Sequence, residues 1–360
     1  MKGFAKILTV KFGLIFITFS LAEGAARIYG YFFISSVWAT SWTNIAESMN
    51  IDKLQGNYYP AAYDPVIGHV PKPGVHMSWD GAIVTIGPDG TRSNGTSTEL
   101  PAKPSILAVG DSFTYGDQVN DTETWPAQLE KTLSIRTLNA GVFGYGLDQT
   151  VLMAERQLKT QTPDILIVGI IPDDINRTEL SVRTGIAKPV FAISDDRLEL
   201  IPAENNKSQA KKYQHLENIA ANLRAVFGYS FLIHHMMFRL APEYWLSKRL
   251  NVREHNDGVQ VSCRLAQRIA DLQVKTKLLL MQYPAHNIIS NSRGGDVEML
   301  LDCARNTNLI VVDSFSKLRA IFERDFELFN SLYFGHMSPS GNRFIASLLA
   351  AKIEKRQLTE

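Results

Sequence analysis

Cysteine is scarce in this sequence, and neither sign of charge is in excess. The two cysteines, Cys263 and Cys303, form no CxxC pair, which excludes a zinc ribbon and a thioredoxin-type redox site. Lysine and arginine total 37 against 36 aspartates and glutamates, and a net charge of +1 argues against a nucleic-acid partner held by a basic face. The composition, 45% hydrophobic and 20% charged over 360 residues, is that of a folded globular protein.

The sequence also lacks an uninterrupted hydrophobic run of about 20 residues, the length that spans a bilayer. Three lysines precede an uncharged run of only 11 residues, 12–22, which extends further only when Glu23 and Arg27 are included. A basic start before an apolar run is typical of a signal peptide or a signal anchor. Three interpretations stay open: a membrane anchor over residues 1–35, cleavage near Ala22, and a buried helix of a cytosolic protein.

The near-zero net charge averages two unlike parts of the chain. Residues 1–22 hold three lysines and no acidic residue, so the remainder has a net charge of −2. Lysines ahead of an apolar helix keep the N-terminus inside, so an anchor predicts a membrane-bound protein with its bulk outside the cytoplasm, or a secreted one after cleavage. In an oxidising compartment Cys263 and Cys303 would form a disulfide; two buried thiols are the alternative.

Two regions follow the N-terminal segment. We interpret residues 36–103 as a linker and a small β-rich adaptor, because residues 57–103 are rich in Pro and Gly and contain short alternating stretches. Over residues 104–355 apolar strands alternate with helices, which predicts a parallel sheet covered on both faces. An insertion at 180–255 interrupts this pattern and is expected to form a cap or side lobe. The expected strands are 106–109, 136–138, 165–170, 277–281 and 309–312.

Polar segments follow three of these strands and precede the last helix. The segment 110–116 reads GDSFTYG, and its Ser112 follows a strand and a turn glycine, as an exposed nucleophile would. The segments 139–146, NAGVFGYG, and 169–175, GIIPDDI, follow the next two strands. The segment 333–342, YFGHMSPSGN, contains His336. Ligands of such folds bind beyond the carboxyl ends of the strands, where these segments lie.

On these four segments the sequence resembles the SGNH/GDSL hydrolase family, and residues 63–92 are similar to a region that precedes the hydrolase domain in membrane-anchored bacterial members. The resemblance implies a flavodoxin-like fold, with three α/β/α layers around a parallel sheet. It implies Ser112 as the nucleophile on an ester carbonyl and His336 as the general base. The N–H groups of Ser112 and Gly144 would form the oxyanion hole. It implies no cofactor and no metal.

One departure from the family pattern lies in the oxyanion hole. Asp173 stands where the family has an asparagine that donates to the oxyanion, and a carboxylate there would repel the developing charge. Losing one such donor costs about 3–4 kcal/mol. Burial beside Asp174 would let Asp173 keep a proton, and Asn176, one helical turn further on, is an alternative donor.

The other departure lies beside the histidine. Tyr333 stands where the family has the aspartate that orients the imidazole, which reduces the expected triad to a Ser–His dyad. Asp313, at the end of the preceding predicted strand, or a backbone carbonyl would be the substitute. Asp111 is expected to satisfy the backbone of the turn rather than to transfer a proton.

Three functional hypotheses follow. The first is an exported serine ester hydrolase acting on O-acyl esters, with an O-acetyl group of a cell-envelope glycan as the substrate that the resemblance implies. The second is an O-acyltransferase that uses the same Ser112 and His336 and passes the acyl group to a sugar. The third is a catalytically inactive module that binds envelope glycan or serves in assembly, marked by Asp173 and Tyr333. The expected partners are an acylated carbohydrate or other ester and, through the N-terminal helix, a membrane.

Overall fold

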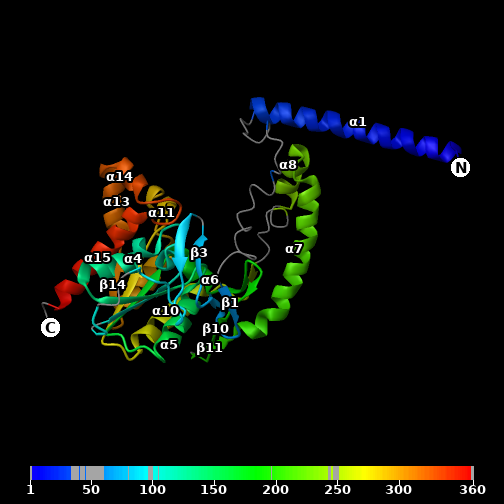
Figure 1. Ribbon diagram of the computed structural model, residues 1–360. Coiled ribbons are helices and arrows are strands. Elements are labelled where there is room, and N and C mark those ends of the chain that lie inside the picture. Colours follow the sequence, from blue (N-terminus) through cyan, green and yellow to red (C-terminus); the bar gives the residue numbers. More distant parts are fainter. Residues whose placement is uncertain are drawn as a thin grey trace. The chain divides into compact units, whose positions relative to one another are not determined.

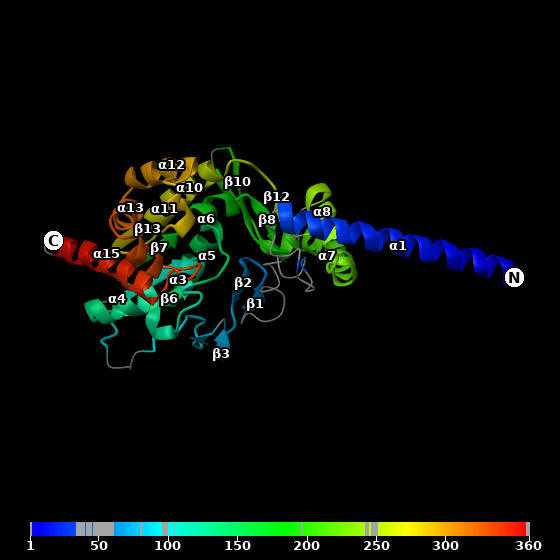
Figure 2. The same cartoon turned by 90° about the horizontal axis from the view of Figure 1, so that it is seen from above.

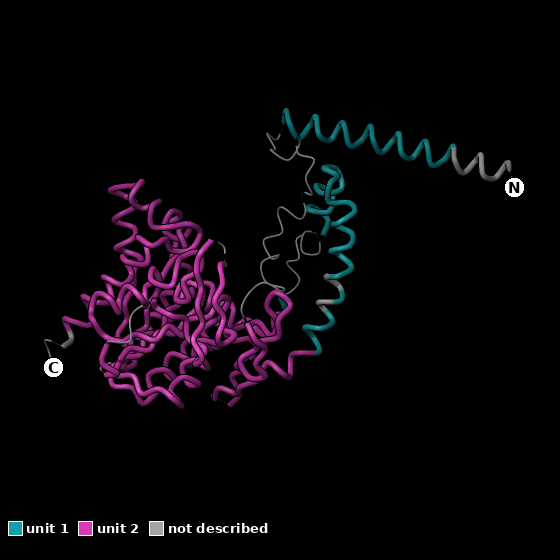
Figure 3. Tube along the Cα trace, viewed as in Figure 1, with its two compact units in different colours: residues 1–58, 208–251 teal, residues 59–207, 252–360 magenta. Residues whose placement is uncertain are grey.

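The structure is a computed structural model that describes residues 2–33, 40, 45, 61–79, 81–95, 100–103, 105–195, 197–241, 245 and 251–357. The chain divides into two compact units, which Figure 3 shows in different colours. Unit 1 combines residues 1–58 with 208–251, and unit 2 combines residues 59–207 with 252–360. The predicted insertion at 180–255 is therefore divided between the two units rather than forming one side lobe.

Unit 2 is built around a five-stranded sheet in which all neighbouring strands are parallel. Its strands lie in the order β14-β13-β7-β5-β6, so that numbering them along the chain gives the flavodoxin-like order 2-1-3-4-5. The three central strands of the sheet are apolar runs with most residues buried, as a sheet covered on both faces requires, whereas the edge strand that ends at Asp313 is mostly half-buried. The strands are β5 (Ser105–Gly110), β6 (Arg136–Gly141), β7 (Ile165–Ile170), β13 (Thr276–Met281) and β14 (Ile310–Asp313).

Helices cover both faces of this sheet (Figures 1 and 2). The first long helix of the sheet region, α4 (Trp125–Leu133), packs against the last, α15 (Pro339–Gln357), on one face. Helices α5 (Leu147–Gln157), α10 (Gly258–Ala270) and α12 (Gly295–Arg305) pack together on the other. The predicted flavodoxin-like three-layer α/β/α fold is therefore confirmed. The shorter helices are α3 (Ser112–Tyr115), η3 (Asp121–Glu123), α6 (Pro172–Arg177), η4 (Ala203–Asn206), α11 (Ala285–Ile289), α13 (Phe315–Arg324) and α14 (Phe326–Ser331).

Local signals in the sequence set several helix starts. Thr124 caps α4 by accepting a hydrogen bond from the Ala127 amide at 3.2 Å, and Pro126 lies in the first turn of that helix. At the start of α15, the Ser338 hydroxyl accepts from the Gly341 amide at 3.2 Å. A polar cap followed by proline is a signal that the sequence alone provides, and both helices begin where it predicts.

Short antiparallel strands surround the sheet in unit 2. The β-rich adaptor contributes two hairpins, β1 (Ala61–Asp64) with β2 (Gly68–Pro71) and β3 (His76–Trp79) with β4 (Ala82–Thr85). The two ends of the insertion add further antiparallel pairs that belong to unit 2. These strands are β8 (Leu180–Arg183), β9 (Ile186–Ala187), β10 (Val190–Ser194), β11 (Arg197–Ile201) and β12 (Val252–Arg253).

Unit 1 is helical in its described part. Helix α1 (Lys2–Phe33) contains a stretch, Val10–Phe33, that is long and apolar enough to cross a membrane, and no residue of its most apolar part is buried inside the protein. Helix α7 (Lys207–Phe227) and helix α8 (Phe231–Leu240) come from the second part of the insertion, and α8 packs against α1. Most of the expected linker at 36–56 lies outside the described residues.

Candidate active site

The four predicted segments converge at the carboxyl edge of the sheet. Ser112 opens α3 directly after β5, Gly144 follows β6, and Asp173 lies on α6 directly after β7. His336 lies in the turn between α14 and α15. Strands β5 and β7 are neighbours that lead to opposite sides of the sheet order, so the site occupies the topological switch point at which such folds bind ligands.

A sharp turn presents Ser112. The Asp111 carboxylate caps α3 by accepting from the Phe113 amide at 3.0 Å, which is the structural role expected for Asp111. Gly110 admits no side chain, because a Cβ atom there would lie 2.4 Å from the Gly169 carbonyl oxygen on β7. Gly116 ends the helix in a left-handed conformation at φ 88°. The turn therefore fixes the direction of the Ser112 side chain.

Ser112 and His336 form the central contact of the site. The Ser112 Oγ atom lies 2.9 Å from His336 Nε2, a hydrogen-bonding distance across 224 residues of sequence. The Phe113 ring lies beside the imidazole, with 5.0 Å between ring centroids. This is the geometry in which a histidine removes the proton of a serine hydroxyl.

A carboxylate from the serine's own loop lies near the histidine. Asp117 Oδ2 is 3.9 Å from His336 Nε2, the nitrogen that also faces Ser112. Asp117 thus approaches from the serine side of the ring rather than from Nδ1, where a triad aspartate would bind. In the sequence, only its place directly after the segment 110–116 points to this residue.

The turn that carries His336 is held by two neutral side chains. Gln118 accepts the His336 amide at 3.0 Å while its own backbone adopts φ 69°, a strained value for a non-glycine residue. Buried Asn342 accepts the Trp125 amide at 2.8 Å and donates to the Met337 and Ser338 carbonyls, each at 3.0 Å. These contacts join the histidine turn to the serine segment.

Tyr333, at the position of the orienting aspartate, and Asp313, its expected substitute, have other partners. Tyr333 donates its hydroxyl to the Tyr283 carbonyl at 3.0 Å, and burial raises its pKa, so it supplies no anion to the site. Asp313 forms an ion pair with Arg293 at 2.8 Å and accepts the Phe315 amide at 3.0 Å. Asp117, rather than Asp313, is therefore the carboxylate that we associate with His336.

Arg92, in the β-rich adaptor, binds the backbone of the loop that follows Ser112. Its guanidinium is fully buried and donates to the carbonyls of Tyr115 at 2.9 Å and Gly116 at 2.7 Å. It also donates to the Val119 carbonyl at 2.6 Å and pairs with Asp121 at 3.0 Å. The adaptor, for which the sequence indicated no catalytic signature, thus holds the backbone that presents the nucleophile.

The backbone of Gly144 contacts Arg183, a cationic side chain of the insertion. Its backbone has φ 72°, which favours glycine, and its carbonyl accepts from Arg183 Nη1 at 3.0 Å. A Cβ atom at position 144 would lie 2.4 Å from that nitrogen. Arg183 ends β8, so sequence reasoning on the four segments did not find it.

Asp173 and Asp174 differ sharply in environment. The Asp173 side chain is 64% exposed and lies 3.8 Å from Arg177, so the burial expected for Asp173 does not occur. Asp174 is fully buried instead, accepting the Ile171 amide at 2.9 Å and Arg177 at 2.6 Å. Successive residues of a helix point in different directions, so Asp173 faces solvent while Asp174 faces the protein interior. Asn176 is also exposed on this helix.

Buried Asp111 and Asp174 share the charge of Arg177, which lies 3.7 Å from Asp111. Burial raises the pKa of Asp111 to about 6, against the opposing effect of Arg177. Burial, and then the charge of Asp111, raise the pKa of Asp174 well above its ordinary value. Two carboxyls beside one guanidinium therefore favour a state in which one of them keeps a proton. Among the described residues, no group of three or more His, Cys, Asp or Glu side chains is placed to hold a metal ion.

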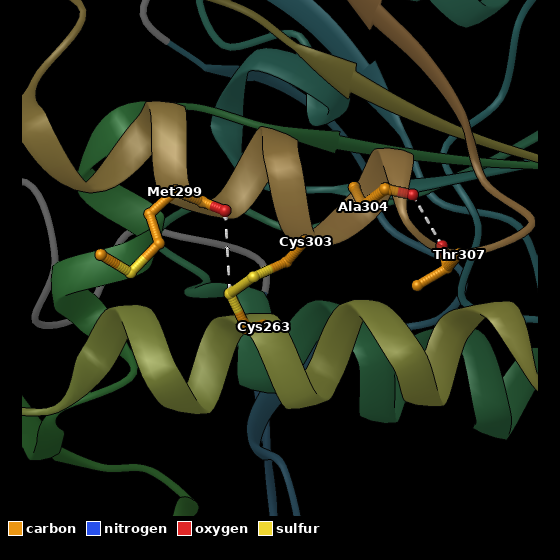
Figure 4. Close-up of a disulfide and its surroundings, with 5 residues drawn as sticks. All are labelled: Cys263, Met299, Cys303, Ala304 and Thr307. Carbon is orange, nitrogen blue, oxygen red and sulfur yellow. Dashed lines mark hydrogen bonds between the residues drawn. A yellow bond between two sulfur atoms is a disulfide. The ribbon is translucent and has the colours of Figure 1, made fainter.

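A disulfide links two helices on one face of the sheet (Figure 4). Cys263 on α10 and Cys303 on α12 are joined, with 5.4 Å between their Cα atoms. This settles the two alternatives for the cysteines in favour of the bond. Disulfides persist in oxidising compartments, so this one agrees with a site of action outside the cytoplasm.

No protein-family model and no curated protein matches the chain. Similar solved structures include a two-domain esterase active on acetylated mannans, with 13% identity, a TM-score of 0.40, and 71% of this chain but 50% of that chain covered. They also include Axe2, an acetylxylan esterase from Geobacillus stearothermophilus, with 14% identity, a TM-score of 0.41, and coverages of 71% and 96%. A lipolytic protein of the G-D-S-L family from Veillonella parvula has 16% identity, a TM-score of 0.35, and coverages of 68% and 94%.

This chain spans about half the length of the two-domain esterase. With identities of 13 to 16% and TM-scores of 0.35 to 0.41, the likeness does not assign an activity to this chain. The chain's own sheet order and its Ser112–His336 contact define the class: a flavodoxin-like α/β protein with a serine–histidine pair at the switch point.

Proposed function

We propose that this protein is a membrane-anchored serine ester hydrolase of the SGNH type. Its substrates would be O-acyl esters, in particular O-acetyl groups on a carbohydrate of the cell envelope. The observation that carries the proposal is the 2.9 Å contact between Ser112 Oγ and His336 Nε2 at the carboxyl edge of the sheet. The N-terminal apolar helix and the disulfide support action outside the cytoplasm.

In the proposed reaction, Ser112 Oγ attacks the ester carbonyl carbon as His336 Nε2 takes the hydroxyl proton. The C–O bond to the alcohol then breaks, and His336 returns the proton to the leaving oxygen. Water attacks the resulting acyl-enzyme with His336 again as base, which releases the carboxylic acid and restores Ser112. Asp117, 3.9 Å from Nε2, would stabilise the imidazolium that forms in each step.

The oxyanion would be held by the N–H groups of Ser112 and Gly144. Ser112 begins a helix, and the first amides of a helix have no acceptor within it, so this N–H is suited to a negative charge. Asp173 cannot donate as the expected asparagine would. Arg183, bonded to the Gly144 carbonyl, would bring a positive charge to the same corner and offset the carboxylate.

The test is covalent labelling of the full-length protein in detergent with a fluorophosphonate probe. We expect wild type to be labelled, and Ser112→Ala to lose both labelling and turnover of an aryl acetate. The matched control is Ser347→Ala, which removes an exposed hydroxyl on α15. A wild-type protein that takes no label, or a Ser112→Ala variant that keeps its turnover, would refute the proposal and favour the inactive glycan-binding module.

The same preparation distinguishes hydrolase from O-acyltransferase. Both reactions pass through the acyl-enzyme on Ser112, so labelling alone does not separate them. We expect an acetylated substrate mixed with an unacetylated glycan to yield free acetate, with the acceptor unchanged. Acetyl groups recovered on the acceptor would assign transfer instead.

A further inference from the structure

Glu23 on α1 serves as the N-terminal cap of α8 within unit 1. Its carboxylate accepts the amides of Phe231 at 2.8 Å and Leu232 at 2.9 Å, and the Ser230 hydroxyl at 2.7 Å. Ser230 in turn accepts the Ile233 amide at 3.1 Å. The first amides of α8, which have no acceptor within their own helix, are thus satisfied by a residue more than 200 positions away.

Arg27 completes this joint. Its Nε atom donates to Glu23 at 2.7 Å, and its Nη2 atom donates to the Tyr229 carbonyl at 2.9 Å. Buried Phe231 packs against Ala26 beside them. The two charged residues that interrupt the apolar helix are therefore engaged with α8, which explains why an otherwise apolar segment carries them. We call Glu23, Arg27 and the start of α8 the capped joint.

The surface of α1 changes character at the capped joint. Every residue of 10–22 is exposed, so this half of the helix presents its many apolar side chains on all sides. From Glu23 to Gly30 several residues are partly or fully covered by unit 1. Residues 2–22 extend about 31 Å at the rise of an α-helix, close to the hydrocarbon thickness of about 30 Å. This stretch includes Lys2, Lys6 and Lys11 in its first half, and lysine stems can carry their charged ends toward the membrane surface.

Exposed apolar side chains surround the capped joint. Helix α8, which Figure 1 shows beside the C-terminal half of α1, exposes Met236 by 49%, Phe238 by 42% and Leu240 by 76%. Tyr229, between α7 and α8, is 51% exposed. A water-soluble surface rarely gathers large apolar residues in this way, and aromatic residues are typical of the membrane–water interface.

We propose that the capped joint marks the outer boundary of the membrane and that α8 lies in the interfacial layer, with Met236, Phe238 and Leu240 against lipid. The inference rests on the proposed membrane anchor and adds where the span ends and which second element touches the bilayer. The exposed apolar side chains of α8 continue the surface of residues 10–22 of α1, which the proposed anchor places in lipid, and we therefore take lipid as the partner of this surface. A span that continued to Phe33 would instead bury Glu23, Arg27 and the polar start of α8 in hydrocarbon.

The experiment uses the full-length protein in phosphatidylcholine vesicles with brominated acyl chains. Both native cysteines are in the disulfide, so an introduced cysteine can be labelled alone with an environment-sensitive fluorophore. We expect brominated lipid to quench most of the fluorescence at Leu240→Cys and Met236→Cys. Leu21→Cys, within residues 10–22 of α1, is the positive control, and Lys352→Cys, exposed on α15 in unit 2, is the unquenched control.

A second substitution tests the joint. In the Leu240→Cys background, Glu23→Ala should abolish most of the quenching at position 240, while quenching at Leu21→Cys stays unchanged. Position 240 as unquenched as position 352 in wild type would overturn the inference while leaving the anchor intact. An unquenched Leu21→Cys would mean that α1 does not enter the bilayer, which overturns the anchor as well.

Discussion

Ser112 and His336 lie in turns held by Gln118, Asn342, the buried Arg92 and the Asp111 carboxylate, whereas α6 gathers carboxylates around Arg177. The first region is buried at Ser112 and half-buried at His336; the second has one carboxylate in solvent and its neighbour buried. Both regions belong to the proposed site.

The difference separates two tasks. The bonds around Ser112 and His336 fix the distance between nucleophile and base, so a change there should unfold or misalign the loop. The charges around α6 set the electrostatic environment of the oxyanion, so a change there should alter rate or pH dependence with less effect on stability. Substitutions in each region therefore test the division.

The largest expected effect comes from Arg92→Ala. It leaves several buried carbonyls and the Asp121 carboxylate without their partner, which costs about 3–5 kcal/mol when a buried pair is broken. The urea unfolding midpoint should fall accordingly. Arg136→Ala, an exposed arginine at the start of β6, is the matched control and should change stability by less than about 0.5 kcal/mol. Equal midpoints for wild type and Arg92→Ala would show that these contacts are not needed.

Asp111→Asn is expected to have a smaller effect, which should appear in the pH dependence of the folding stability. Burial raises the pKa of Asp111 to about 6, so the folded state holds its proton more tightly than the unfolded chain. Stability from this group is complete below the unfolded pKa of about 3.9 and is lost as pH rises through the folded value. The slope is at most about 1.4 kcal/mol per pH unit.

Asp111→Asn keeps the acceptor for the Phe113 amide but removes this titration. Urea unfolding between pH 4 and pH 6 should therefore show a flatter pH dependence in the variant than in wild type. Asp296→Asn, an exposed carboxylate on α12, should keep the wild-type slope. The same slope in Asp111→Asn would place the proton on Asp174 alone.

What the sequence predicted follows from local signals. The strands of the sheet are apolar runs between turns, and Ser112 and Ser338 adjoin a strand end and a helix start, so their positions follow from neighbours in the chain. His336 followed from the resemblance of its segment. These signals require no knowledge of distant contacts.

What the sequence did not predict depends on distant contacts. Arg92, Gln118 and Arg183 act through backbone carbonyls or amides in other segments, which leave no pattern in their own surroundings. The exposure of Asp173 and the burial of Asp174 depend on how α6 rotates against the sheet. In the sequence, Glu23 is a charged residue within an apolar helix, and its role as the cap of α8 depends on a segment more than 200 residues away.

The smallest effect is expected from Asp173→Asn, which restores the donor that the family pattern places here. The side chain is 64% exposed, so the gain should fall below the full value of a buried oxyanion donor. We expect kcat/KM for an aryl acetate to rise about tenfold, about 1.4 kcal/mol of transition-state stabilisation. Because the carboxylate is in solvent, the urea midpoint should not move. A rate that is unchanged or lower would show that Asp173 has a role of its own, and α6 would then be a working part of the site rather than an impaired one.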